Sequence, residues 1–535
     1  MRQTLAWLAC TLTLTGISTP SWALDNSIGD SGIYAHRLHQ APYNLTGRKI
    51  AIGQVEIGRP GQFGFDKIAA WNPVFKLAGV YFRNKPVKSN GNLDNHAAMV
   101  ATVMISRDKR IPGVAPDARL YSSAVGILKG GGQAEECLAT QHVAQQNSGD
   151  VRAINFSFGE SLQRDSRENA QLDGNALLTQ CIDWSSRIHD VLYVIAGNQG
   201  KGGIPIPTDH YNGITTAYTT KREGKFAKVD FANLSALPVG IGRTVIKREI
   251  NAGERRAISL LAPGNKIALY DLSGKVNVVS GTSFAAPHIT ASVALLQEYG
   301  DRQLKQKQAN WSLDSRRHEV MKAVLLNSAD KIQDRGDGLL LGMMRTVLSK
   351  GNKTWLDSDA YKNPKIPLDI EMGSGHLNAM RAYQQFSAGQ WQPEKEVPSL
   401  GWNYSQVGEN NHQDYIISQS LPQGSYVSIT LAWDRKVELN DKNNNEQYDM
   451  GENFSDRGLN NLDLYLMSTD TQNNAQSVCS SISGVDSTEH IFCPIPTTGS
   501  YKIRVQYSQQ INEPTQPYAL AWWTFTNPTK TEKLR

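Results

Sequence analysis

The chain has 535 residues, more than one hydrophobic core usually organises, so at least two domains are expected. Hydrophobic residues make up 40% of it and charged residues 20%, which is typical of globular proteins. The formal net charge of +5 is small for this length and no basic block is present. Nucleic acid and a polyanionic membrane surface are therefore not expected as partners.

The first 23 residues have the pattern of a secretory signal peptide. Arg2 precedes an apolar stretch over residues 5–17, and Ser21-Trp22-Ala23 provides a small-x-small cleavage pattern. The apolar run is too short to cross a bilayer, and no later stretch is long and apolar enough to do so. We therefore expect a secreted or periplasmic protein without a membrane span.

Four cysteines remain when Cys10, inside this apolar run, is set aside. An even number in an oxidising compartment permits two disulfides. Cys479 and Cys493 are close in sequence and are the preferred pair. Cys137 and Cys181 can pair only if the helices that carry them touch.

Residues 24–46 form an N-terminal extension, and residues 49–57 then read as a buried strand. Glu56 lies near its carboxyl end, where a parallel α/β sheet presents side chains for function. The alternative is a surface glutamate at a strand end. Further along, Asp94 or Asn95 is a good helix N-cap, which places His96 at the start of a small-residue helix. A histidine there can also be a satisfied core residue.

Two further strands precede the most informative stretch of the chain. Residues 153–159 form one, and residues 191–200 form another that ends in a tight turn at Asn198, a residue that turns favour for local reasons. Residues 276–279 are then a short apolar strand, followed by a turn and a buried helix over residues 284–296. Ser283 therefore lies in the first turn of a helix, where free N–H groups stabilise negative charge, although Ser and Thr are also ordinary caps.

The eight residues from Gly281 to His288 resemble the nucleophile motif of the subtilases, the subtilisin-like serine proteases of peptidase family S8. The upstream residues match the acid, histidine, serine order of that family. The resemblance covers about residues 47–386 and implies a secreted serine endopeptidase. In it Ser283 is the nucleophile, His96 the general base and Glu56 the acid that orients His96.

The resemblance also implies how a substrate is held. Asn198 and the Ser283 N–H form the oxyanion hole. Phe156, Ser157, Phe158 and Gly159 pair with the extended substrate backbone. The chain departs from the family pattern in three places: the acid is Glu instead of Asp, Ala-Ala-Met follows His96 where the family has Gly-Thr-His, and no long pro-domain separates residue 23 from the first strand.

Beyond a catalytic domain of residues 47–387, residues 388–400 read as a linker with two prolines. Residues 401–528 show short alternating segments separated by turn residues, as in an antiparallel sandwich, and residues 529–535 are a tail. This region resembles the pre-peptidase or P-like β-sandwich domains that follow many secreted bacterial peptidases.

A polar loop within the sandwich region has the spacing of a calcium-binding loop. Oxygen-bearing side chains fall at positions one, three, five, seven, nine and twelve, namely Asp441, Asn443, Asn445, Gln447, Asp449 and Glu452. The sixth position is Glu446, where the sharp turn favours Gly, and no flanking helices are evident. A structural calcium site and an ordinary hairpin loop both remain open.

The predicted fold is α/β, a doubly wound, mostly parallel sheet with helices on both faces, plus a C-terminal antiparallel β-sandwich. We expect protein or peptide substrates, no cofactor for the chemistry, and a monomer. The main alternative is a catalytically impaired binding protein on the same scaffold, because the acid and the residues after His96 are altered. A serine esterase is a second alternative.

Overall fold

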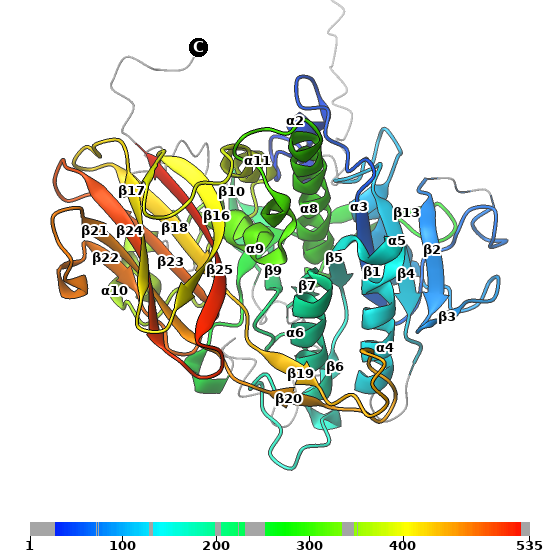
Figure 1. Ribbon diagram of the computed structural model, residues 1–535. Coiled ribbons are helices and arrows are strands. Elements are labelled where there is room, and N and C mark those ends of the chain that lie inside the picture. Colours follow the sequence, from blue (N-terminus) through cyan, green and yellow to red (C-terminus); the bar gives the residue numbers. More distant parts are fainter. Residues whose placement is uncertain are drawn as a thin grey trace, which may run out of the picture.

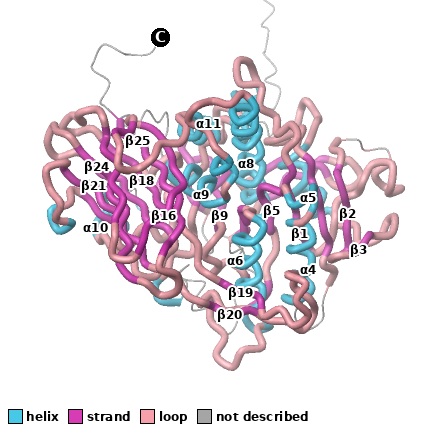
Figure 2. The backbone as a smooth tube through the Cα atoms, in the orientation of Figure 1, coloured by secondary structure: helices cyan, strands magenta, loops and turns pink. Residues whose placement is uncertain are grey.

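The computed structural model describes residues 27–525 apart from 71, 73, 128–131, 198–204, 223, 230–251, 334–346, 350 and 352. Figure 1 shows two bodies packed side by side, an α/β body and a body made of strands. Figure 2 shows the same division, with the long helices gathered in the first body. In the described part no helix is long and apolar enough to cross a membrane.

A ten-stranded sheet forms the centre of the α/β body. Nine strands follow one path and β11 (Leu260–Pro263) branches from it by pairing with β9. The path runs β14 (Val347–Leu348), β10 (Lys225–Lys228), β9 (Ile214–Arg222), β7 (Leu192–Ala196), β5 (Val151–Phe156), β1 (Ala51–Glu56), β4 (Arg119–Ala124), β2 (Leu77–Phe82) and β3 (Lys85–Pro86). The pairs β9–β10 and β2–β3 are antiparallel, and the other pairs are parallel.

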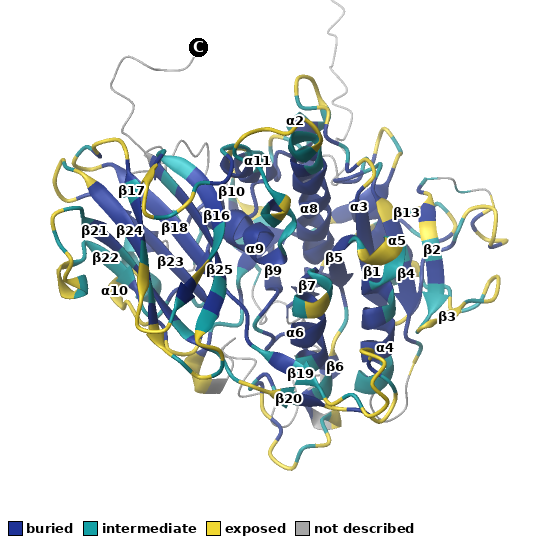
Figure 3. Cartoon of the chain, in the orientation of Figure 1, coloured by how far each residue is buried: buried dark blue, intermediate teal, exposed yellow. Residues whose placement is uncertain are grey.

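Helices cover both faces of this sheet, which confirms the predicted α/β class (Figure 1). One face contacts α3 (Asn95–Ile105) and α8 (Thr282–Lys305), and the other contacts α4 (Gln133–Ala144) and α6 (Leu177–His189). All six residues of β1 are buried, because helices cover both faces of the sheet at this strand (Figure 3). Ile52 packs on the α8 side and Val55 on the α4 side.

Shorter elements complete the α/β body. They are α2 (Ala35–His39), α5 (Gln146–Gly149), α9 (His318–Asn327), α10 (Asp359–Lys362) and α11 (Ala379–Ser387), with the small pairs β6 (Glu160–Ser161) with β8 (Pro205–Ile206) and β12 (Ile267–Tyr270) with β13 (Val276–Val279). The amphipathic pattern over residues 318–331 predicts a helix, and α9 ends at Asn327, four residues before the end of that pattern. Strand β13 pairs only with β12 in the described sheets, outside the main sheet.

The second body is a sandwich of two antiparallel-dominated sheets, as predicted. One sheet has the order β15 (Glu396–Val397), β17 (His412–Ile417), β24 (Tyr501–Gln509), β21 (Asn461–Ser468) and β22 (Cys479–Ser481). The other has the order β16 (Leu400–Gly408), β25 (Thr515–Phe525), β18 (Tyr426–Ala432) and β23 (Thr488–Pro494). Apolar side chains from both sheets fill one core between them.

Both cysteine pairs are disulfides. The Cys479–Cys493 bond joins β22 in one sheet of the sandwich to β23 in the other. The Cys137–Cys181 bond joins α4 to α6, which do touch, so the condition set for this pair is met. Both of these helical cysteines are fully buried.

The sandwich packs against helix α9 through strands β18 and β25. An arm formed by β19 (Val437–Leu439) and β20 (Phe454–Asp456) leaves the sandwich and runs along α6 (Figure 1). Its residue Tyr448 exchanges two hydrogen bonds with the Gln141 side chain on α4, at 2.6 and 3.2 Å. The arm therefore connects the sandwich to the disulfide-linked helices.

Candidate active site

Strand β1 and helix α3 bring Glu56 and His96 together. Glu56 is the last residue of β1, at the carboxyl edge of the sheet. His96 is the second residue of α3, whose N-cap Asp94 accepts the Ala97 N–H at 2.9 Å. Gly58 makes this approach possible, because a Cβ there would lie 2.3 Å from the Asp94 Cβ. The chain can thus turn closely past the start of α3.

The Glu56 carboxylate faces the imidazole of His96. Glu56 Oε2 lies 3.3 Å from His96 Nδ1, the glutamate side chain is 2% exposed, and the imidazole is 37% exposed. Burial raises the pKa of Glu56, and the charge of His96 opposes that rise. Burial lowers the pKa of His96, but the charge of Glu56, its hydrogen bond and the charge of Asp94 together outweigh that effect, so the pKa of His96 is raised overall. A buried carboxylate therefore favours the protonated form of a partly exposed imidazole.

Ser283 lies beside this pair, in the first turn of α8. It is buried, and its Oγ donates a hydrogen bond to the Ser157 carbonyl at 3.0 Å. The Ser157 hydroxyl in turn donates to the Ser283 carbonyl at 2.9 Å. The ring of Phe284, the next residue, is centred 5.5 Å from the His96 ring. The start of α8 is therefore held against both β5 and the imidazole.

Residues 156–159 lead from the buried end of β5 to the surface. Phe156 and Ser157 are buried, Phe158 is half-buried and Gly159 is exposed. The rings of Phe156 and Phe158 stack with centroids 4.9 Å apart. Aromatic packing anchors the start of the segment while its end reaches solvent.

Asn198 lies outside the described residues. Its predecessor Gly197 follows β7, and the Gly197 carbonyl accepts a hydrogen bond from the Thr282 hydroxyl at 2.9 Å. The Gly197 N–H donates to the Thr216 carbonyl at 2.8 Å. The end of β7 is therefore held next to the residue that precedes Ser283.

The polar loop 441–452 is closed by hydrogen bonds among its own residues. Asp441 accepts the N–H groups of Asn443, Asn444 and Glu446 at 2.7–3.2 Å. Glu452 accepts the N–H groups of Lys442 and Asp449 at 2.8 and 2.9 Å. Glu446 adopts φ +59°, so the sharp turn at the sixth position forms without glycine. Gln447 donates its N–H to Asn445 Oδ1 at 2.8 Å.

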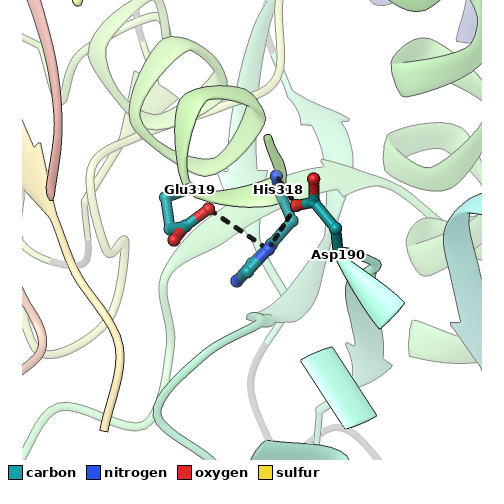
Figure 4. A group of neighbouring side chains, drawn as sticks. All are labelled: Asp190, His318 and Glu319. Atoms are coloured by element: carbon teal, nitrogen blue, oxygen red, sulfur yellow. Dashed lines mark hydrogen bonds and ion pairs between the residues drawn. The ribbon is translucent and has the colours of Figure 1, made fainter. Parts of the chain in front are cut away.

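The structure adds a role for Asp94, beyond helix capping, and a cluster of side chains that pattern reasoning missed. Asp94 acts on both members of the pair, because its charge raises the pKa of Glu56 and of His96. Its place two residues before His96 was the available signal. Sequence reasoning also missed the cluster of Asp190, His318 and Glu319 (Figure 4), because Asp190 is far in sequence from the adjacent pair His318 and Glu319.

The fold and this arrangement define an α/β serine peptidase, and comparison with known proteins identifies the family. The model of the subtilase family, Peptidase_S8, matches residues 27–344. The chain belongs to the subtilase family and is a serine-type endopeptidase.

The individual relatives have low sequence identity to this chain. Thermitase of Thermoactinomyces vulgaris is 22% identical over 251 residues, covering 47% of this chain and 71% of thermitase. Subtilisin Savinase of Lederbergia lenta is 25% identical over 46% of this chain and 76% of that protein. The thermostable alkaline protease of Halalkalibacterium halodurans is 22% identical, and only 58% of its length is covered. The solved structure of the prenylagaramide maturation protease PagA gives a TM-score of 0.39 at 20% identity, over 63% of this chain and 93% of that chain.

Proposed function

We propose that this protein hydrolyses peptide bonds through Ser283, His96 and Glu56. The Ser283 hydroxyl turns from the Ser157 carbonyl to His96, loses its proton to the imidazole and attacks the scissile carbonyl. His96 later returns the proton to the leaving amine. Glu56 orients the imidazole and compensates its positive charge, and Asn198 with the Ser283 N–H stabilises the oxyanion.

The observation that carries this proposal is the position of His96. Its Nδ1 is 3.3 Å from a buried carboxylate, and its ring lies beside the helix turn that holds Ser283. The extra methylene of Glu56, compared with aspartate, is accommodated at the end of β1. Substrate binding along residues 156–159 adds a backbone strand next to Ser283, since Ser157 is hydrogen-bonded to it.

A fluorophosphonate probe tests the proposal on the full-length protein. We expect a covalent adduct on Ser283, located by mass spectrometry of the digested protein, and its loss in His96→Ala. Thr282→Val is a control that keeps both proposed reacting side chains. Absence of labelling on well-folded wild-type protein would favour the non-catalytic binding scaffold instead.

We further propose that the loop 441–452 binds calcium as a structural ion. Its donor set of Asp441, Asn443, Asn445, Asp449 and Glu452, with the Gln447 position, has the oxygen chemistry that Ca²⁺ prefers. The turn at Glu446 and the carboxylates already held by backbone N–H groups support this assignment. Because Tyr448 belongs to this loop and is hydrogen-bonded to Gln141, the ion would hold the arm on α4.

Calcium removal tests this second proposal. Chelation should lower the thermal midpoint of wild-type protein and leave that of Asp441→Asn/Glu452→Gln unchanged, since the double variant has lost the ion beforehand. Equal responses of the two proteins to chelator would contradict a site in this loop.

Export is proposed from residues 1–23. Expression in a bacterium with a secretion pathway should yield mature protein whose amino-terminal sequence begins after Ala23. An intact amino terminus in the cytoplasmic fraction would contradict it.

A further inference from the structure

A second group of ligand-type side chains consists of Asp190, His318 and Glu319 (Figure 4). Asp190 follows α6 and precedes β7, whereas His318 and Glu319 are the first two residues of α9. His318 Nδ1 is 2.9 Å from Asp190 Oδ1 and 3.2 Å from Glu319 Oε2. One nitrogen and two carboxylate oxygens therefore face a common point, all within 4.8 Å of one another.

These separations match the spacing of donors around one metal ion. Bonds of about 2.0–2.2 Å from zinc to nitrogen and oxygen place adjacent donors about 3.0–3.5 Å apart. The separation of 3.2 Å from His318 Nδ1 to Glu319 Oε2 lies within this range, and the separation of 2.9 Å to Asp190 Oδ1 is slightly shorter. A mixed set of one imidazole and two carboxylates suits a divalent transition metal better than calcium or magnesium.

Glu319 provides an independent indication of a ligand. Its residue is 6% exposed, and its Oε2 has no hydrogen-bond partner in the described part of the chain. That oxygen is directed at His318 Nδ1 (Figure 4). A buried carboxylate oxygen without a hydrogen bond is costly, and coordination would satisfy it.

The residues around the cluster orient its donors. His318 Nε2, the other ring nitrogen, is 3.0 Å from Asp434 Oδ2, and the Tyr404 hydroxyl donates to Glu319 Oε1 at 3.4 Å. An imidazole whose second nitrogen is bound to a carboxylate is the usual arrangement of a metal-binding histidine. Asp190 Oδ1 also accepts the backbone N–H of His318 at 2.9 Å. Arg317 lies 3.6 Å from Asp190 Oδ2, so it compensates part of the carboxylate charge.

We propose that Asp190, His318 Nδ1 and Glu319 bind one zinc ion that fastens the sandwich to the catalytic body. Asp434 and Tyr404 belong to the sandwich region and contact His318 and Glu319 of the α/β body. The ion would therefore strengthen a contact between the two bodies. The Asp190 side chain is 32% exposed, which gives the ion a route to the site. This site is separate from the proposed catalytic residues and does not depend on them.

The test uses full-length Ser283→Ala protein, freed of metal and then exposed to micromolar free zinc. We expect about one zinc per chain at this site by elemental analysis after gel filtration, and a higher thermal midpoint with zinc. His318→Gln should lose both effects, and Asp434→Asn should weaken zinc binding about 10- to 100-fold. His412→Gln is the matched control, because His412 also lies beside a carboxylate, at 4.0 Å from Asp414.

Two results would contradict a zinc site at His318. Zinc binding and thermal midpoint that are the same in His318→Gln as in the parent protein would place the ion elsewhere. A folded parent protein that binds no zinc would leave His318 as an ion-pair partner of the three carboxylates and overturn the site. If His318→Gln does not fold, Glu319→Gln replaces it, since this variant keeps the side-chain size and removes one ligand charge.

Discussion

At the scale of single residues, the unusual feature is a glutamate where the family pattern has an aspartate. Glu56 is buried at the end of β1, and its Oε1 has no hydrogen-bond partner in the described structure. Its Oε2 is the atom that approaches His96. The glutamate therefore contributes mainly a fixed negative charge and an orienting contact for the imidazole.

Replacement of this charge should be costly for catalysis. Glu56→Gln keeps the side-chain size but stabilises the imidazolium poorly, so we expect kcat to fall about 10³- to 10⁴-fold. Glu56→Asp keeps the charge and withdraws it by one methylene, so it should retain more activity than Glu56→Gln. Steady-state kinetics on a peptide amide measure both, and wild-type rates in Glu56→Gln would remove Glu56 from the mechanism.

The pH dependence follows from the raised pKa of His96. Only the neutral imidazole can accept the Ser283 proton, so activity should fall as the pH drops below a pKa that lies above the ordinary histidine value of about 6.5. Removing the Glu56 charge removes the largest of the contributions that raise this pKa, and that of Asp94 remains. The acid limb of kcat/KM should therefore move to lower pH in Glu56→Gln, and an unmoved limb would show that another group controls it.

At the scale of elements, the site depends on how helices are fixed to the sheet. Helix α8 carries Ser283 and α3 carries His96, and these two helices pack on the same face of the sheet. On the other face, α4 and α6 are joined by the Cys137–Cys181 bond, which closes a separation of 44 residues. The disulfide holds the surface on which the arm of the sandwich rests.

This disulfide should contribute more to stability than its counterpart in the sandwich. Cys137→Ala/Cys181→Ala should lower the free energy of unfolding by about 2–4 kcal/mol, because the reduced chain gains the entropy of an open loop. The Cys479–Cys493 bond closes only 14 residues, so its removal should cost about 1 kcal/mol less on the same grounds. Urea unfolding measures both variants. The reverse order would show that strain or denatured-state structure outweighs loop entropy.

Local sequence patterns predicted much of the α/β body. The strand that ends at Glu56, the N-cap before His96 and the helix after Ser283 all follow from residue types within a few positions of one another. The pattern over residues 318–331 extends four residues beyond the end of α9, because Ser328 to Lys331 remain buried after the helix stops. Periodicity reports burial and cannot by itself separate a buried helix from the buried chain that follows it.

At the scale of the whole molecule, the two bodies share buried charges. Arg435, next to the sandwich strand β18, donates to Asp183 Oδ2 on α6 at 2.7 Å and to the Gly174 carbonyl at 2.7 Å. The arginine side chain is 2% exposed and the aspartate is fully buried. These residues are 252 positions apart, and neither lies in a motif, so no local signal could have paired them.

Loss of this arginine should destabilise the whole protein. Arg435→Met would leave the Asp183 carboxylate buried without its partner, at a cost of about 3–5 kcal/mol. Lys436→Met is the control, because Lys436 is the cation next to Arg435 in the chain and pairs with Glu513 near the surface. Such surface pairs contribute about 1 kcal/mol or less. Thermal unfolding compares the two variants. Equal midpoints would mean that the contact between the bodies does not depend on this ion pair.

The central claim is that Glu56, His96 and Ser283 act as one unit, and the kinetics of combined variants test it most directly. We would measure kcat for peptide hydrolysis by His96→Ala, Ser283→Ala and the double variant, with folding checked by circular dichroism. Residues that act together give the double variant about the same residual rate as each single variant. Losses that multiply, or a Ser283→Ala protein that retains the wild-type rate, would contradict the account.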